Sequence, residues 1–297
     1  MVPDFEQQRE QIRAVGPNLP DLLQALQVER RALLGVLDTL RPDDWRRSTP
    51  CPGWAVHDLV LHLLGDDLGV LAILRDGHAA PLPAGASLAE AIDALNDAWI
   101  GAAAGRFSPR MLRDMLAWSG DETHRFFAAE AWDAPSAMGV SWAGTAPSPH
   151  VLEVAREYTE RWLHQQQLRE TLRCGSLGDP ILTRVLLHSL AHCLPVAYAG
   201  NDAPEGSTVR LAVTGFPTLS LGLRRDADAW RLLRGADLAG EPDCSIVAPG
   251  EPLWRAWTTN GTPAELEAAA TVHGPAPDLA RPLWQARAII SSQPIGR

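Results

Sequence analysis

Residues 48–63 have the sequence STPCPGWAVHDLVLHL, and this stretch organises the N-terminal half of the chain. The prolines and the glycine of its first half are typical of a loop. Over residues 54–74, apolar side chains then recur at helical spacing until Asp76-Gly77 interrupts the pattern. We therefore expect a loop that leads into a long helix, with His62 near the middle of that helix among apolar neighbours. A buried histidine needs a polar partner, which can be a carbonyl group, an acidic side chain or a metal ion.

Further helical patterns lie on both sides of this helix. They cover residues 20–40, 87–104, 108–131, 150–173 and 181–199. Ser108-Pro109 is a typical helix start, with an N-cap residue followed by proline at the first helical position. We expect these helices to form a bundle within residues 1–200.

The pattern changes after residue 206. Residues 208–214 and 218–224 alternate apolar and polar side chains on either side of a Gly-Phe-Pro turn, as paired strands do. Shorter strands are expected at 230–233, 245–248 and 269–273, and helices at 252–259 and 278–290. Because residues 200–206 are small or polar and have no periodicity, we place a linker there. The sequence thus predicts a helical domain over 1–200, followed by a smaller α+β domain over 207–297.

The composition disfavours several classes of function. The chain has 26 basic and 36 acidic residues and a formal charge of −10, which disfavours binding to nucleic acid or to anionic lipid. No apolar run is long enough to span a membrane, and the first thirteen residues are polar, so we expect a cytoplasmic protein without a membrane partner. Every basic residue is arginine. A chain without lysine cannot form a lysine Schiff base, and this arginine-rich composition points to an actinobacterial source.

Glu160 and His164 are four residues apart within the predicted helix 150–173, so their side chains lie on the same face of that helix. In a bundle, the helix that carries His62 can lie beside this face. Two imidazoles and one carboxylate suit zinc or another first-row metal, and three protein ligands leave coordination positions open for substrate. From spacing alone this pair is a weak signal, and a solvent-facing glutamate with a hydrogen-bonded histidine is the commoner explanation.

Other side chains could also carry chemistry. His188 and His192 are one helical turn apart and Cys193 follows, a set that could bind zinc or could simply line a domain interface. Cys51 could be a nucleophile or a structural residue of the loop. The sequence leaves both alternatives open and favours the structural one in each case.

Residues 48–63 resemble the Thr-x-Cys-x-x-Trp-x-Val-x-Asp-Leu-x-x-His-Leu motif of the mycothiol-dependent maleylpyruvate isomerase family. Residues 156–169 are similar to the second motif of that family, in which Glu-x-x-x-His faces the first histidine. The resemblance implies a DinB-like four-helix bundle in which His62, Glu160 and His164 bind one divalent metal ion, with zinc the first choice. The C-terminal region, especially residues 230–233 and 272–279, resembles the sterol-carrier-like α+β domain that follows the bundle in many members.

The same resemblance implies an enzyme. It would use the thiolate of mycothiol, a low-molecular-weight thiol, on a small-molecule substrate, either as an isomerase or as a thiol transferase. Two alternatives stay open: a thiol-independent isomerase, lyase or hydrolase whose metal acts as a Lewis acid, and a non-catalytic ligand-binding protein.

The chain departs from the family at Gln167, where members often have aspartate three residues after the second histidine. A carboxylate there could orient a metal-bound histidine or a substrate hydroxyl, whereas glutamine supplies only a neutral hydrogen bond. We take Gln167 as a candidate substrate contact. The resemblance implies a dicarboxylate substrate held by arginines, which makes Arg281 and Arg287, in the last predicted helix, further candidates. Exposed arginines on an amphipathic helix are the commoner explanation for both.

Overall fold

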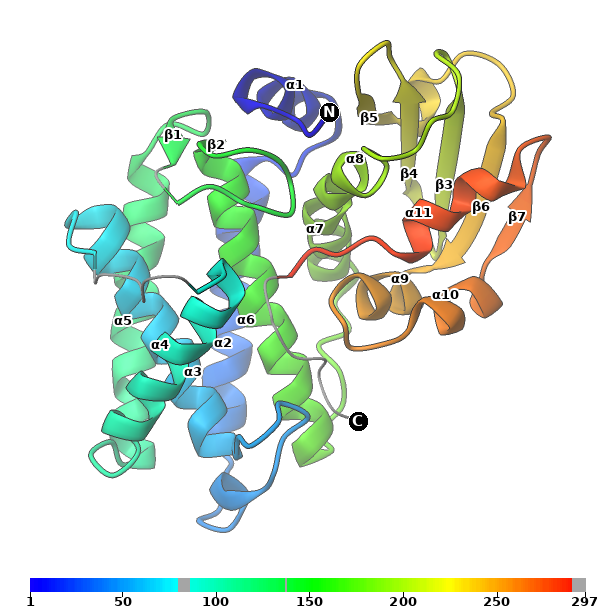
Figure 1. Cartoon of the computed structure of the whole chain (residues 1–297). Coiled ribbons are helices and arrows are strands. Elements are labelled where there is room, and N and C mark those ends of the chain that lie inside the picture. The colour runs from blue at the N-terminus through cyan, green and yellow to red at the C-terminus, as the bar shows by residue number, and fades with distance from the viewer. Residues whose placement is uncertain (80–85, 137, 290–297) are drawn as a thin grey trace. The chain divides into compact units, whose positions relative to one another are not determined.

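The computed structural model describes residues 1–79, 86–136 and 138–289 (Figure 1). Its described residues divide into two compact units. The first, which we call the bundle unit, consists of Leu19–Ala131 and Glu157–Asp179. The second, the sheet unit, consists of Met1–Asn18, Trp132–Arg156 and Pro180–Ile289.

Helices make up the bundle unit, as the sequence predicts, and Figure 1 shows them running side by side. They are α2 (Leu19–Leu37), α3 (Val56–Val70), α4 (Leu88–Ala103), α5 (Pro109–Ala129) and the larger part of α6 (His150–Leu172). A π-helical turn, Leu71–Arg75, continues α3. Helix α3 packs against α4 and α5, and α2 packs against α5.

The core of the bundle unit is aliphatic. Fully buried leucines from three helices meet in it: Leu33, Leu59, Leu63, Leu64, Leu112 and Leu116. Complete burial of one such side chain contributes about 1.5–3 kcal/mol, as an upper estimate. Side chains fix where two of the helices begin, because Ser87 and Ser108 accept hydrogen bonds from the backbone of the first turns of α4 and α5. The predicted start at Ser108-Pro109 is therefore confirmed.

Helices α3 and α4 approach closely at Gly65. A Cβ atom at this position would lie 2.7 Å from Nε1 of Trp99, which itself donates a hydrogen bond of 2.8 Å to the carbonyl of Leu61. A side chain at position 65 would therefore displace the indole and break this link between the two helices.

A network of buried charges joins the helices of the bundle unit, and we call it the ion network. Asp67 on α3 accepts hydrogen bonds from Arg30 of α2, Ser119 of α5 and Arg161 of α6. Arg161 also donates to Glu157, one turn earlier on α6. Burial alone would raise the pKa of Asp67, but the two guanidinium groups and these hydrogen bonds lower it to about 2. The carboxylate is therefore charged and fully compensated.

A five-stranded sheet dominates the sheet unit. Its strands are β3 (Thr208–Thr214), β4 (Phe216–Arg225), β5 (Trp230–Arg234), β6 (Cys244–Pro249) and β7 (Thr271–His273), in the order β5-β4-β3-β6-β7. Strands β3 and β6 are parallel and the other pairs are antiparallel. Alternate residues of β3 are buried, as expected for a sheet with one face on a core. The predicted α+β character of this region is confirmed.

The remaining elements of the sheet unit are short. They are α1 (Phe5–Val15), the strand pair β1 (Pro135–Ser136) and β2 (Ser148–Pro149), α7 (Pro180–Leu190), α8 (Leu194–Ala197), α9 (Gly250–Trp257), α10 (Pro263–Ala269), α11 (Arg281–Trp284) and the 3₁₀ turns Ala191–Cys193, Gly235–Asp237 and Pro277–Ala280. One described stretch, Pro180–Ala197, has the length and mean hydropathy of a membrane-crossing helix, but 61% of it is buried in the protein. Because α7 packs on α9 and β4, it serves as a core helix of this unit.

Three elements differ from the sequence prediction. Helix α1 lies among the polar first residues, for which no helix was predicted, and α10 lies between two predicted elements; both begin with a capping box that marks their start. The helix predicted at 278–290 is shorter than expected: a 3₁₀ turn, Pro277–Ala280, runs into α11, and α11 ends at Trp284. Beyond it the backbone N–H of Ala288 donates to the carbonyl of Trp257, a tertiary contact that takes the place of a helical bond.

The predicted linker at 200–206 does separate α8 from β3. The compact unit that contains the sheet, however, also contains α1, α7 and α8. The predicted domain limits, 1–200 and 207–297, stay a prediction.

Candidate metal centre

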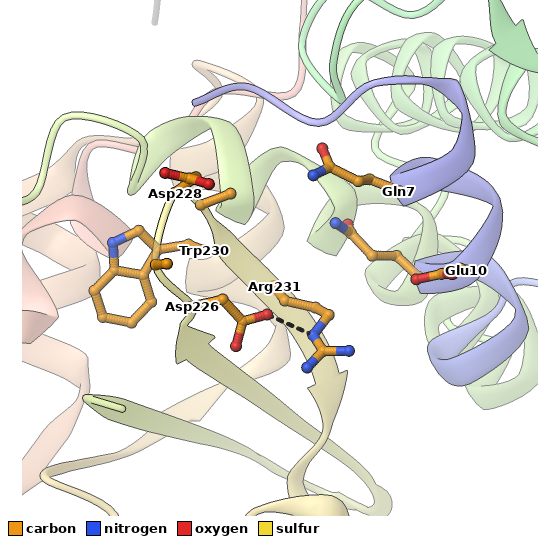
Figure 2. Close-up of a pocket in the computed structure, with 9 residues that line it drawn as sticks. Gln7, Glu10, Asp226, Asp228, Trp230 and Arg231 are labelled. Carbon is orange, nitrogen blue, oxygen red and sulfur yellow. Dashed lines mark ion pairs between the residues drawn. The ribbon is translucent and has the colours of Figure 1, made fainter. Parts of the chain in front are cut away.

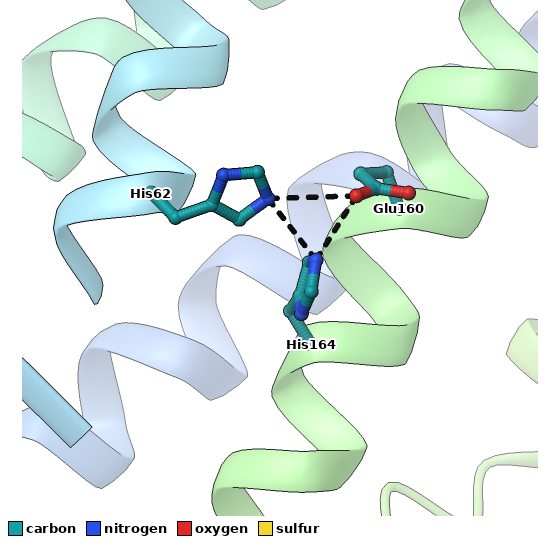
Figure 3. A group of neighbouring side chains, drawn as sticks. All are labelled: His62, Glu160 and His164. Atoms are coloured by element: carbon teal, nitrogen blue, oxygen red, sulfur yellow. Dashed lines mark hydrogen bonds and ion pairs between the residues drawn. The ribbon is translucent and has the colours of Figure 1, made fainter. Parts of the chain in front are cut away.

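Two helices of the bundle unit bring three predicted side chains together. His62 lies in the middle of α3, and Glu160 and His164 lie one turn apart on the facing side of α6 (Figure 3). Each offers one ligand atom, and these atoms all lie within 4.8 Å of one another. We call these three residues the triad.

The ligand atoms of the triad converge. Nε2 of His164 lies 3.1 Å from Nε2 of His62 and 2.9 Å from Oε1 of Glu160, and the distance from His62 to the same oxygen is 3.5 Å. Two imidazole lone pairs that face each other at this distance repel unless a proton or a cation lies between them. The donor set, two nitrogens and one carboxylate oxygen, matches that of open three-ligand zinc sites. These residues therefore fit a divalent metal ion.

The pKa shifts of Glu160 and His164 also favour a bound cation. Burial alone would raise the pKa of Glu160, but His164 and His62 hold it well below its usual value. Burial alone would lower the pKa of His164, but Glu160 holds it well above its usual value. The triad thus retains a carboxylate charge in a buried place, and a bound cation would replace the proton that His164 carries.

Asp66 is a fourth polar residue of this region that the sequence analysis missed. Its Oδ2 lies 3.3 Å from Nε2 of His62. Burial raises the pKa of Asp66, His62 lowers it and Glu160 raises it again, to about 6. The signal was present in the sequence, because His62 and Asp66 have the same four-residue spacing as Glu160 and His164.

The loop before α3, which contains the first half of the motif in residues 48–63, supplies one wall of the centre. The ring of Trp54 lies 5.0 Å from that of His62 and 6.5 Å from that of His164, between centroids. Cys51, from the same loop, is buried and donates from Sγ to Oε1 of Gln167 over 3.1 Å. The same oxygen lies 2.7 Å from Nδ1 of His164. Of the predicted substrate contacts, Gln167 is therefore beside the triad.

The two predicted arginines belong to the sheet unit. Arg281 is 76% exposed and pairs with Asp278 over 2.9 Å, one turn away. Arg287 lies beyond the end of α11 and donates to the carbonyls of Ala256 and Ala286. Their role in substrate binding stays a prediction.

The competing pair, His188 and His192, also lies in the sheet unit. Nε2 of His192 lies 2.5 Å from the carbonyl of Gly16, and burial lowers its pKa to about 4. Burial also raises the pKa of the Cys193 thiol. A neutral histidine that donates to a carbonyl, next to a protonated thiol, has a structural explanation.

A separate pocket of about 250 Å³ lies in the sheet unit between α1 and the turn that joins β4 to β5 (Figure 2). Its lining is mixed: Gln7 and Glu10 face Asp226, Asp228 and Arg231, and Trp230 adds an apolar surface. Arg231 pairs with Asp226 over 3.0 Å. The lining contains no residue of the triad.

The triad lies within the stretch of the chain that matches a known family model. The model of the mycothiol maleylpyruvate isomerase N-terminal domain matches residues 26–169, a range that contains both sequence motifs and all three triad residues. No curated protein matches the chain with significance.

Solved structures show the same fold over most of the chain. The mycothiol-dependent maleylpyruvate isomerase matches with a TM-score of 0.53, and a histidine-to-alanine mutant of it with 0.52. Each match is 15% identical and covers 86% of this chain and 93% of the other. A ubiquinone synthesis protein, UbiJ-SCP2, matches 30% of this chain and 85% of its own at 20% identity, with a TM-score of 0.21 that is too low to indicate a shared fold.

Proposed function

We propose that the protein is a metal-dependent enzyme that uses the thiolate of mycothiol on a small activated substrate, because residues 26–169 match the model of the mycothiol maleylpyruvate isomerase N-terminal domain. The observation that carries the proposal is the convergence of three ligand atoms, from His62, Glu160 and His164, in the bundle unit. Zinc is the proposed metal, because two imidazoles and one carboxylate are a common set for catalytic zinc.

A divalent metal at the triad would lower the pKa of a thiol and so supply a thiolate at neutral pH. His62 and His164 would bind it through Nε2, and Glu160 would contribute the negative charge. Trp54 would shield one side of the centre from water. Addition of the thiolate to a double bond, rotation about the resulting single bond and expulsion of the same thiolate give isomerisation. Displacement of a leaving group instead gives a thioether.

The nucleophile is proposed to come from a separate thiol molecule. Cys51 is the cysteine beside the triad, but it is only 8% exposed and its S–H donates to Gln167. This thiol is placed to hold a side chain rather than to attack a substrate. Cys193 and Cys244 lie in the sheet unit, where burial raises the pKa of each thiol.

Metal analysis of the purified protein tests the first half of the proposal. We expect about one zinc ion per wild-type chain after zinc loading, and loss of that ion in His62→Ala and in His164→Ala. His124→Ala is the matched control, because His124 lies on α5 of the same unit and contacts Gln27 rather than the triad. A wild-type protein without stoichiometric metal would contradict the proposal, as would equal loss in the control.

Calorimetric titration of mycothiol into the zinc-loaded protein tests the second half. We expect saturable binding to wild type and none to His164→Ala. If wild type holds zinc but mycothiol gives no heat, the thiol-independent alternative replaces the thiol mechanism.

A further inference from the structure

Gln167, from outside the triad, makes a direct polar contact to a triad imidazole. It lies one turn after His164 on α6 and is 2% exposed. Its Oε1 lies 2.7 Å from Nδ1 of His164, on the opposite side of the ring from the ligand atom Nε2. An amide oxygen only accepts hydrogen bonds, so the proton of this contact belongs to Nδ1.

Cys51 holds this amide in place. Its thiol donates to the same Oε1 over 3.1 Å, and the oxygen has two lone pairs, one for each donor. The loop before α3 therefore fixes the orientation of a side chain on α6. In this orientation the oxygen, and not the NH₂ group, faces His164.

We infer that Gln167 is a positioning residue of the metal centre: its amide oxygen keeps a proton on Nδ1 of His164 and so leaves the Nε2 lone pair for the metal. This inference rests on the proposed function. A histidine that binds a metal generally donates its other N–H to an acceptor that fixes the tautomer and the ring orientation. A neutral amide fixes both while adding no charge to the centre.

His62 shows by contrast what the hydrogen bond contributes. Its Nδ1 is buried, and no group among the described residues accepts a hydrogen bond from it. The ring of His62 is held by packing among apolar neighbours on α3 and by Trp54. His164 is thus the triad imidazole with a fixed tautomer. The amide oxygen that fixes it is already used by two donors, which favours a positioning role over the predicted substrate contact.

Zinc affinity, measured by competition with a chromophoric chelator, tests the inference. Loss of an outer-shell partner typically weakens metal binding by about 10–100-fold, and we expect a weakening in this range for Gln167→Leu. Gln167→Glu keeps an oxygen acceptor for the Nδ1–H of His164, so this variant should bind zinc at least as tightly as wild type. Cys51→Ala leaves the bond to His164 in place, so its effect should be smaller than that of Gln167→Leu.

The matched control is Gln166→Leu, which removes a similarly buried amide from the same helix turn. Gln166 contacts the backbone of Leu177 and not the triad. We expect zinc affinity within about threefold of wild type, below the range that outer-shell substitutions produce. Equal weakening in Gln166→Leu and Gln167→Leu would show a structural effect on α6 and would overturn the inference.

A second readout reports on the hydrogen bond itself. In protein labelled with ¹⁵N-histidine, the Nδ1–H proton of His164 should appear as a downfield signal protected from exchange. It should persist in Gln166→Leu and be lost or shifted upfield in Gln167→Leu. Wild type without this signal, or an unchanged signal in Gln167→Leu, overturns the inference. Wild type that binds no zinc overturns the proposed function and the inference with it, whereas zinc binding unaffected by Gln167→Leu overturns the inference alone.

Discussion

Two polar clusters lie next to each other in the bundle unit, and consecutive residues of α3 divide between them. Asp67 belongs to the ion network, where two arginines and a serine donate to its carboxylate. Asp66 faces the triad, where its Oδ2 is buried 3.3 Å from Nε2 of His62 and makes no hydrogen bond to any described residue. The pKa of Asp67 is lowered to about 2 and that of Asp66 is raised to about 6. Two adjacent residues thus carry one carboxylate with several hydrogen-bond donors, Asp67, and one with a buried oxygen that makes no hydrogen bond to the described residues, Asp66.

This difference between Asp66 and Asp67 distinguishes residues that stabilise the fold from residues that could bind a ligand. Buried charges that are fully paired hold helices in one arrangement, and removing one partner leaves the others uncompensated. Buried polar groups without partners cost free energy in the empty protein and mark places that a ligand can satisfy. The ion network should therefore determine whether the bundle folds, and the triad with Asp66 should determine what it binds.

The largest expected effect is the loss of stability in Asp67→Asn. This change leaves Arg30 and Arg161 buried without their shared carboxylate, and breaking a buried pair in this way costs about 3–5 kcal/mol. Denaturant unfolding measures it. Asp66→Asn is the matched control and should not destabilise the metal-free protein. Equal destabilisation by the two substitutions would remove the distinction between the clusters.

Zinc should stabilise the protein through the triad and independently of the ion network. At a free zinc concentration of 100 times Kd, binding adds about 2.7 kcal/mol to the free energy of unfolding. We expect this increment in wild type, its removal by a chelator, and its absence in Glu160→Gln. Ser119→Ala perturbs the ion network, and the folded variant should still gain the full increment of about 2.7 kcal/mol from zinc. A smaller gain in this variant would mean that the ion network and the triad are coupled.

The two aspartates should give opposite pH dependences in the metal-free protein. The folded-state pKa of Asp67, about 2, is below its ordinary value of 3.8, so its contribution is present above pH 4 and is lost as the pH falls towards 2. This contribution is about 2 kcal/mol. The folded-state pKa of Asp66, about 6, is above its ordinary value, so the folded protein gains stability as the pH falls from 6 to 4.

Stability measured against pH for wild type and Asp66→Asn checks these signs. Asp66→Asn should be more stable than wild type above pH 6 and should lose the rise between pH 6 and pH 4. A profile unchanged by the substitution would contradict the pKa assigned to Asp66.

Ser119→Ala should have the smallest effect. It removes one hydrogen bond to the charged Asp67, a loss of about 1.5 kcal/mol, and leaves both arginines in place. Ser189→Ala is the control, because Ser189 is equally buried but donates to the neutral carbonyl of Val185. A loss in Ser189→Ala as large as that in Ser119→Ala would indicate that the charge of Asp67 adds little to the bond.

The sequence predicted the parts of the molecule that have a periodic or motif signal. Helical spacing located α2 to α6, alternation located β3 and β4, and the residues around His62 identified the facing pair Glu160 and His164. The early end of α11 could not be anticipated, because Ala288 bonds to Trp257, a residue far away in the sequence, instead of continuing the helix.

The ion network could not be predicted from the sequence either. Arg30, Asp67 and Arg161 each have the pattern of a charge on a helix surface, and nothing local shows that three helices bring them together. The capping boxes of α1 and α10 were readable but lay in segments with weak apolar periodicity. Metal binding itself stays a prediction from motif and geometry.

Every position from His62 to Asp67 on α3 has an assigned task. His62 is a proposed ligand, the two leucines after it fill the core, Gly65 has no room for a Cβ, Asp66 faces the triad and Asp67 anchors the ion network. In a saturation mutagenesis library these six codons would form one uninterrupted intolerant block. A screen for folded protein and a parallel screen for zinc retention would divide this block, with His62 scored only by the second and Gly65 and Asp67 already by the first.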